Sequence, residues 1–138
     1  AMLLVARRAV FSIDWLLLLV FILMFINLSM VGELSVVQQA IGTMRQWPGG
    51  DISVGVLLSQ VISNVPATLL LAEESEWQPL AWGVSVGGFG LVIGSMANLI
   101  ALRLARQPGM WREFHYWSLP MLGLAWLFAV AWKSALTW

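Results

Sequence analysis

Five polar residues that could bind ions lie in two short stretches of an otherwise apolar chain. Ser63, Asn64 and Thr68 belong to the first stretch, and Ser95 and Asn98 belong to the second. Hydroxyl and amide groups are neutral and can donate or accept hydrogen bonds, and their oxygens also suit hard cations. Together with free backbone groups, these side chains could bind a small anion with a cation beside it.

The composition predicts an integral membrane protein. The chain has 138 residues, of which 60% are hydrophobic and 10% charged, whereas a soluble domain has about 45–50% apolar residues. Its net charge is zero and no basic stripe is present, which excludes a nucleic-acid partner. Cysteine is absent, so the sequence offers neither disulfides nor thiolate chemistry. We expect a multi-pass protein of a cell membrane, most simply the bacterial inner membrane.

The first polar stretch interrupts an apolar segment, residues 52–72, that is long enough to cross a bilayer. Pro66 removes an amide donor and disfavours helix at the preceding residue, while Ser63 and Asn64 are typical helix N-caps. We therefore predict a re-entrant helical hairpin with its tip within residues 59–68. Backbone freed at membrane depth needs a protein partner or a watery cavity, so the tip is a candidate site. A proline-kinked spanning helix, with Asn64 bonded to a neighbour, remains the alternative.

The second stretch follows a cluster of glycines in residues 80–106. Gly87, Gly88, Gly90 and Gly94 stand close together and make a continuous helix unfavourable. We predict a broken helix that restarts at Ser95, and the remaining 11 residues to position 106 span about 16 Å, half the hydrocarbon core. The alternative is a continuous helix that uses glycines for close packing. A dinucleotide-binding loop would require a strand and an acidic ribose partner, and the sequence predicts neither.

The remaining chain predicts two transmembrane helices, over residues 10–31 and 116–132, and an amphipathic interfacial helix over residues 33–46. Leu34, Val37, Ile41 and Met44 would form the apolar face of that amphipathic helix. Asp14 is expected at the membrane interface, and residues 107–115 are expected to form a polar turn. The predicted fold is all-α: a single transmembrane domain, residues 1–138, with three membrane-crossing segments, one of them broken, and a re-entrant hairpin.

The distribution of basic residues favours the re-entrant hairpin over a spanning helix. If residues 52–72 return to their own side, five arginines share one face against two basic residues on the other. The five are Arg7, Arg8, Arg103, Arg106 and Arg112, and the two are Arg45 and Lys133. If the segment spans instead, the split is four against three. The positive-inside rule favours the first arrangement, with the five arginines cytoplasmic.

Two motifs in this order are similar to a known transporter family. The segment Ser63-Asn-Val-Pro-Ala-Thr68, then Gly87-Gly88, then Gly94-Ser-Met-Ala-Asn-Leu-Ile100 resembles the C-terminal half of the ion-transporter superfamily, in its arsenical-pump and citrate-permease-like branch. In that family each inverted repeat carries a re-entrant hairpin with a Ser-Asn tip and a discontinuous helix with a glycine-rich loop. Val65 stands where the dicarboxylate carriers typically have threonine.

The resemblance implies one inverted repeat of a longer secondary transporter for an anion or oxyanion, which could be arsenite-like, an inorganic anion or a carboxylate. It implies coupling to sodium or protons, no other cofactor, and either a missing N-terminal repeat or a second protomer as partner within the lipid bilayer. The site residues that it implies are Ser63, Asn64, Val65, Pro66, Thr68, Gly94, Ser95, Ala97 and Asn98, with sodium near Asn64 and Asn98.

The residues themselves agree with this resemblance without requiring it. Two helix N-termini, at residues 64–67 and 95–97, would meet near mid-membrane, and each would offer free amides and a partial positive charge to an anion. An enzyme would need a nucleophile with a base or a metal-binding set, and the only histidine, His115, is expected in the polar turn. A non-transporting membrane scaffold or accessory subunit is the alternative function.

Overall fold

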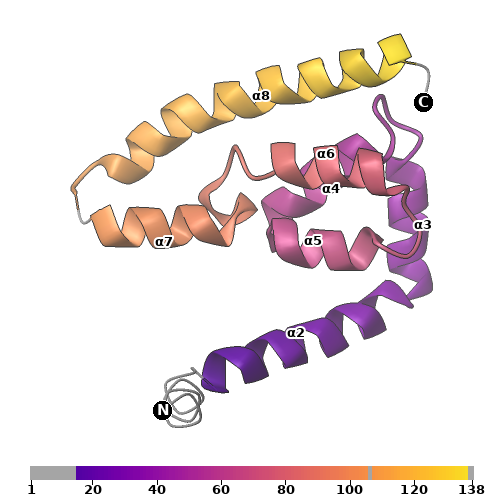
Figure 1. Ribbon diagram of the computed structural model, residues 1–138, viewed down its shortest axis with the longest axis horizontal. Helices are drawn as coiled ribbons and strands as arrows, with labels where there is room; N and C mark the ends of the chain where they lie inside the picture. Colours follow the sequence, from indigo (N-terminus) through magenta and orange to yellow (C-terminus); the bar gives the residue numbers. More distant parts are fainter. Residues whose placement is uncertain (1–14, 106, 137–138) are drawn as a thin grey trace, which may run out of the picture.

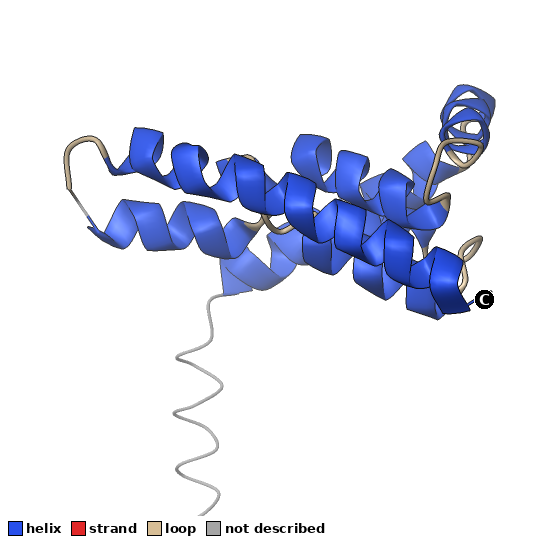
Figure 2. Ribbon diagram, turned by 90° about the horizontal axis from the view of Figure 1, so that it is seen from above, coloured by secondary structure: helices blue, strands red, loops and turns tan. Residues whose placement is uncertain are grey.

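The computed structural model describes residues 15–105 and 107–136. All regular structure in these residues is helical, as the sequence predicts (Figures 1 and 2). In chain order the elements are α2 (Trp15–Gly32), α3 (Ser35–Met44), α4 (Asp51–Ile62), α5 (Asn64–Leu71), α6 (Trp77–Val86), the 3-10 helix η1 (Val92–Gly94), α7 (Met96–Ala105) and α8 (Met110–Leu136). Residues 1–14, including Asp14 and the start of the predicted helix 10–31, lie outside the described part.

One described helix is long and apolar enough to cross a bilayer by itself, over Met110–Ala135 in α8. The segment Leu18–Gly32 in α2 passes the same test only together with α3, and the two are bent by 79°. Helices α4 and α7 are apolar but short. The number of membrane crossings therefore stays a prediction.

Helices α4 and α5 form a hairpin with a very tight tip. They pack against each other and are separated by one non-helical residue, Ser63. The sequence placed the tip within residues 59–68, and the observed turn at Ser63 lies inside that range. Pro66 is the third residue of α5 and so lies in its first turn, where the sequence predicted it. Amides in the first helical turn have no intrahelical partner, so proline there costs no hydrogen bond.

Small residues bring α4 and α6 into backbone contact. A methyl group added at Gly83 would lie 2.7 Å from the carbonyl oxygen of Ile52, and one added at Gly55 would lie 3.1 Å from the backbone of Gly83. A methyl group added at Gly87 would lie 2.5 Å from Ser59. The order of these contacts shows that the two helices run in parallel, and their close approach is typical of helix packing in membranes.

The amphipathic helix α3 packs on the protein through its predicted apolar face. Ile41 is buried in a cluster with residues of α4, α5 and α6, and Val37 and Met44 pack against that cluster. Leu34, by contrast, is 55% exposed, because α3 begins only at Ser35. Whether α3 also lies at a membrane interface stays a prediction.

A single arginine ties both ends of the hairpin to the end of α3. The Arg45 guanidinium forms ion pairs with Asp51 at 2.7 Å and Glu74 at 3.1 Å, and it donates a hydrogen bond to Ser75 at 3.1 Å. Asp51 begins α4, whereas Glu74 and Ser75 follow α5. The hairpin therefore begins and ends at the same edge of the molecule (Figure 1).

The last helix is longer than the sequence predicted. The polar turn was expected to extend to residue 115, but α8 begins at Met110, directly after Gly109 with a φ of +84°. His115 consequently lies within the helix, where its Nδ1 is 2.6 Å from the carbonyl oxygen of Trp111. Polar residues in the first turns of α8 do not end the helix, and the acidic Glu113 in the first turn suits the positive end of the helix dipole.

The contact between α4 and α6 gives a testable prediction. Gly83→Ala should destabilise the protein by about 1–3 kcal/mol, because the new methyl group meets helix backbone, which cannot move aside. The control is Gly42→Ala in α3, where nothing lies within 4 Å of the added group; this change should be neutral or stabilising by up to about 1 kcal/mol. Unfolding in detergent measures both, and equal effects of the two substitutions would contradict the close contact.

Candidate functional site

The hairpin tip is built around a strained serine. Ser63 has a φ of +75° and a ψ of 155°, a conformation that residues with a side chain rarely adopt. Its hydroxyl oxygen is buried and has no hydrogen-bond partner in the described part of the chain. The sequence placed Ser63 correctly at the N-cap position of α5, but its side chain does not cap the helix. Strain and an unpaired buried hydroxyl together mark the tip as a candidate site.

Helix α5 presents its N-terminus at this tip. Asn64 is its first residue and is half-buried, and Pro66 in the same turn has no amide hydrogen. The Thr68 hydroxyl donates to the carbonyl oxygen of Asn64 at 2.8 Å. Val65 is 45% exposed. The free amides and the partial positive charge of the helix end thus lie at the tip beside Asn64.

The break between α6 and α7 ends at a capped helix start. Ser95 precedes α7, and its hydroxyl oxygen accepts a hydrogen bond from the Ala97 amide at 3.3 Å, which is N-cap geometry. Asn98, in the first turn of α7, donates its side-chain amide to the carbonyl oxygen of Gly88 at 2.7 Å. The glycines therefore mark a true break, where the sequence predicts one, and Asn98 is anchored across it.

The two helix starts meet. Helices α5 and α7 point away from each other in Figure 1, with their N-terminal ends facing near the centre of the molecule. Gly88 lies between them: a methyl group added there would be 3.9 Å from the side-chain nitrogen of Asn64 and 4.0 Å from Cβ of Ser95. The structure thus brings together Asn64, Ser95 and Asn98 from elements far apart in the sequence. Their role as ligands stays a prediction.

Three other predicted site residues are not shown to contact the place where the two helix starts meet. Gly94 is buried and serves packing, since a methyl group added there would lie 2.6 Å from the carbonyl oxygen of Gly87. Val65 and Ala97 are exposed. Across residues 15–105 and 107–136, no group of three or more His, Asp or Glu side chains could hold a metal ion. A sodium site would depend on the amide, hydroxyl and carbonyl oxygens, and it stays a prediction.

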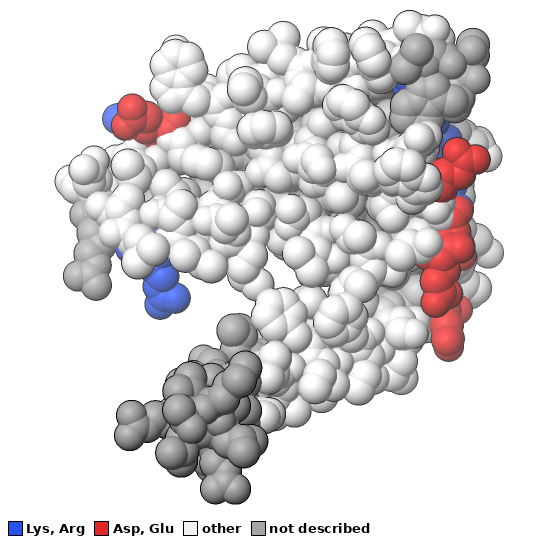
Figure 3. All heavy atoms as spheres, viewed as in Figure 1, with Lys and Arg blue, Asp and Glu red and all other residues white. Residues whose placement is uncertain are grey.

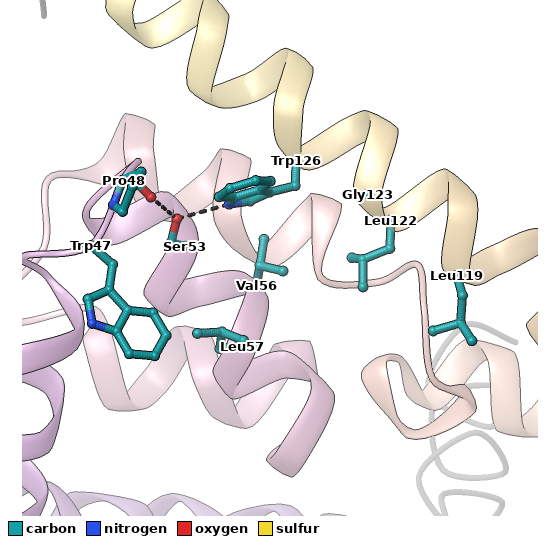
Figure 4. A pocket seen from close by; sticks show the side chains of 9 residues that line it. All are labelled: Trp47, Pro48, Ser53, Val56, Leu57, Leu119, Leu122, Gly123 and Trp126. Atoms are coloured by element: carbon teal, nitrogen blue, oxygen red, sulfur yellow. Dashed lines mark hydrogen bonds between the residues drawn. The ribbon is translucent and has the colours of Figure 1, made fainter.

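An apolar groove lies elsewhere, between α4, α8 and the turn before α4 (Figure 4). It has a volume of about 430 Å³. Its lining includes Trp126, whose indole nitrogen donates to the Ser53 hydroxyl at 2.9 Å, and Ser53 in turn donates to the carbonyl oxygen of Pro48. These bonds attach α8 to the start of the hairpin. The groove does not include the predicted site residues.

Sequence reasoning missed two residues that hold the break. Gln60 in α4 donates to the carbonyl oxygens of Gly87 at 2.7 Å and Phe89 at 3.1 Å, and it accepts from the Leu91 amide at 2.8 Å. The buried Ser118 in α8 accepts from the Gly90 amide at 2.8 Å. The only sequence signal for Gln60 and Ser118 was that each is a polar residue within an apolar helix. This signal does not reveal which groups they bind.

Curated proteins of bacteria and archaea are similar to the chain. The inner membrane protein YbiR of Escherichia coli (strain K12) is 47% identical over 124 residues, which cover 86% of this chain and 32% of that protein. The uncharacterized transporter MJ0456 of Methanocaldococcus jannaschii is 41% identical over 98 residues, covering 68% of this chain and 26% of that protein. The uncharacterized transporter Rv2684 of Mycobacterium tuberculosis is 30% identical over 121 residues, or 71% and 28%.

By these names, the relatives are membrane proteins and transporters. The chain spans about a third or less of their length. No protein-family model and no solved structure matches it.

The strain at Ser63 is directly testable. Ser63→Gly should stabilise the folded protein by about 1 kcal/mol, because glycine adopts a positive φ without steric cost. Ser63→Ala is the control: it removes the hydroxyl but keeps the strained backbone, and it should gain less than the glycine variant. Unfolding of both variants in detergent separates the two effects. A glycine variant less stable than the alanine variant would contradict the strain.

Proposed function

We propose that the chain is one repeat of a secondary active transporter for an anion or oxyanion, with its site at the hairpin tip and the broken-helix loop. The observation that carries this proposal is the meeting of two helix N-termini, those of α5 and α7, beside Asn64, Ser95 and Asn98. Each N-terminus is equivalent to about half a positive charge. An anion at this point would be stabilised without a fixed charge nearby.

The names of the relatives support transport in general. Two of the three reported relatives are named as transporters, and the third as an inner membrane protein. The apolar helix α8 supports a membrane location. The arsenical-pump and citrate-permease-like branch, the ion coupling and the second repeat are parts of our proposal that rest on the motifs at residues 63–68 and 87–100.

Sodium or a proton would be the coupling ion. The unpaired hydroxyl of Ser63 and the amide oxygens of Asn64 and Asn98 are neutral oxygen groups at the point where the anion would bind. Neutral oxygens suit sodium, and no carboxylate lies between residues 52 and 72 or between residues 77 and 105. We therefore favour sodium, bound beside the anion and partly neutralising it.

The proposed membrane orientation follows from the charges at the two ends of the molecule. Acidic side chains gather at the end that carries α3 and the opening of the hairpin (Figure 3). The turn between α7 and α8 lies at the opposite end and is flanked by Arg103 and Arg112. The positive-inside rule places this second end in the cytoplasm, so the hairpin would enter and leave the membrane from outside.

The proposed site predicts the effect of two alanine substitutions. In the full-length protein, Asn64→Ala and Asn98→Ala should each reduce uptake per folded molecule at least about tenfold, because each removes one ligand group from the proposed site. The double variant should lose little more than either single variant, since the residues act on one site. Uptake of labelled phosphate, sulfate, arsenite and citrate into proteoliposomes, with and without sodium, provides the measurement.

Thr43→Ala in α3 is the matched control, because its hydroxyl donates to a carbonyl one turn earlier, away from the tip. It should leave uptake unchanged. If both asparagine variants transport like the wild type, the site is elsewhere. If the wild type takes up none of the four anions under any gradient, the scaffold or accessory-subunit alternative gains support.

The orientation gives a separate prediction. Single cysteines at the exposed positions Gln46 and Glu73, before and after the hairpin, should both react with an impermeant thiol reagent added outside. A cysteine at the exposed Gln107 should react only from the cytoplasm. The chain has no cysteine of its own that would interfere. If positions 46 and 73 react from opposite sides of the membrane, the hairpin spans the membrane and the re-entrant arrangement is wrong.

A further inference from the structure

Gln60 lies in the last turn of α4 and bonds to the break through both the nitrogen and the oxygen of its side-chain amide. Its nitrogen donates to the carbonyl oxygens of Gly87 and Phe89, at 2.7 Å and 3.1 Å, and its oxygen accepts from the Leu91 amide at 2.8 Å. A glutamine amide has two N–H donors and one acceptor oxygen. The nitrogen also lies 3.4 Å from the carbonyl oxygen of Val56, one turn earlier in α4. The shorter bonds of both the nitrogen and the oxygen go to one loop that lies about thirty residues further along the chain.

The loop is shaped around this side chain. A methyl group added at Gly90 would lie 2.6 Å from the side-chain oxygen of Gln60, and one added at Gly94 would lie 3.1 Å from its nitrogen. Gly90 also has a φ of +94°, which disfavours any other residue. These two glycines make room for the Gln60 amide as much as they break the helix.

Gln60 also reaches the candidate site through one intermediate group. The carbonyl oxygens that it binds belong to the residues on either side of Gly88, whose own carbonyl oxygen accepts the side-chain amide of Asn98 at 2.7 Å. Holding both neighbours fixes the direction of the Gly88 carbonyl. That carbonyl in turn fixes the side chain of Asn98.

We propose that Gln60 is a positioning residue that holds the hairpin and the broken helix as one rigid unit and so sets the arrangement of Asn64 and Asn98. The inference rests on the proposed function for its meaning in transport. Its structural part, the rigid coupling of hairpin and loop, stands without a substrate. Ser118 of α8 adds one further bond to the loop by accepting from the Gly90 amide.

Spin labels test the rigid unit without any substrate. Cysteines at Val61 and Ile100, which are 72% and 55% exposed, place one label on the hairpin and one on α7. The wild type should give a narrow distribution of label distances, and Gln60→Met, which fills similar space without donors, should broaden it. Gln38→Met is the matched control, because the Gln38 side chain donates to the carbonyl oxygen of Gly32, at the end of α2, and not to the broken-helix loop. An unchanged distribution in Gln60→Met would overturn the proposal.

A pH-dependent recovery of uptake can show whether residue 60 acts through its hydrogen bonds or only by filling space. The carboxyl group introduced by Gln60→Glu can donate one hydrogen bond and accept another when it is protonated, whereas the carboxylate can only accept. Uptake of the same four labelled anions should fall about tenfold or more in Gln60→Met, and in Gln60→Glu it should recover at about pH 5 relative to about pH 8, after division by the wild-type profile. A flat corrected profile for Gln60→Glu would count against positioning.

No native titratable group next to position 60 would mimic this rescue. Residues 52–72 and 77–95 contain none, and the titratable residue of α8 nearest in sequence to Ser118 is Tyr116. Arg103 lies near the far end of α7. The pH change in the variant would thus come from the introduced carboxyl group.

Hydrogen exchange on the wild type keeps the inference testable if Gln60→Met does not fold. The amides of Gly90 and Leu91 donate to side chains and not to a helix backbone. Both should exchange as slowly as amides inside α6, because their partners are fixed. Fast exchange at Leu91 would refute the rigid coupling of the hairpin and the loop. If exchange is slow and the distribution of label distances is narrow but the wild type shows no uptake, the proposed function alone fails.

Discussion

The backbone contact between α4 and α6 is the constraint on which the candidate site depends. Gly55 and Ser59 face Gly83 and Gly87, and no larger side chain fits between the two parallel helices. Both helices end within a few residues of this contact, at Ile62 and Val86. Because they end together, the next helices also begin close together. Helix α5 turns back while α7 continues onward, so their N-terminal ends face each other.

The break between α6 and α7 removes backbone groups from helical hydrogen bonding in a largely apolar protein. Side chains from three different helices supply the missing partners. Gln60 of α4 binds Gly87, Phe89 and Leu91, Ser118 of α8 binds Gly90, and Asn98 of α7 binds Gly88. An unpaired group in an apolar interior costs several kcal/mol, so these bonds make the break tolerable. The side-chain hydroxyl of Ser63 at the tip, by contrast, is buried and has no partner among residues 15–105 and 107–136.

Much of this fold could be predicted from local sequence. Proline with N-cap residues indicates a helix restart at residues 63–66, and clustered glycines indicate a break before Ser95, since both effects act on the backbone of neighbouring residues. The restart falls within the predicted range because Pro66 costs no hydrogen bond in the first turn of α5. The partners of Gln60 and Ser118 could not be predicted, because the bonds join residues almost thirty positions apart and leave no periodic pattern.

The unpaired serine and the two helix ends can be understood together under the proposed function. A site made of two N-termini offers about one positive charge in total, spread over free amides, which suits a singly charged anion or one oxygen edge of a larger one. Neutral oxygens at the same point allow a cation beside it, so the loaded site would carry little net charge across the membrane. Asn64, Ser95 and Asn98 are only half-buried in this chain. An ion bound there would remain partly hydrated, and since water weakens each of these attractions, tight binding requires the open side to be covered by a second repeat or a second protomer.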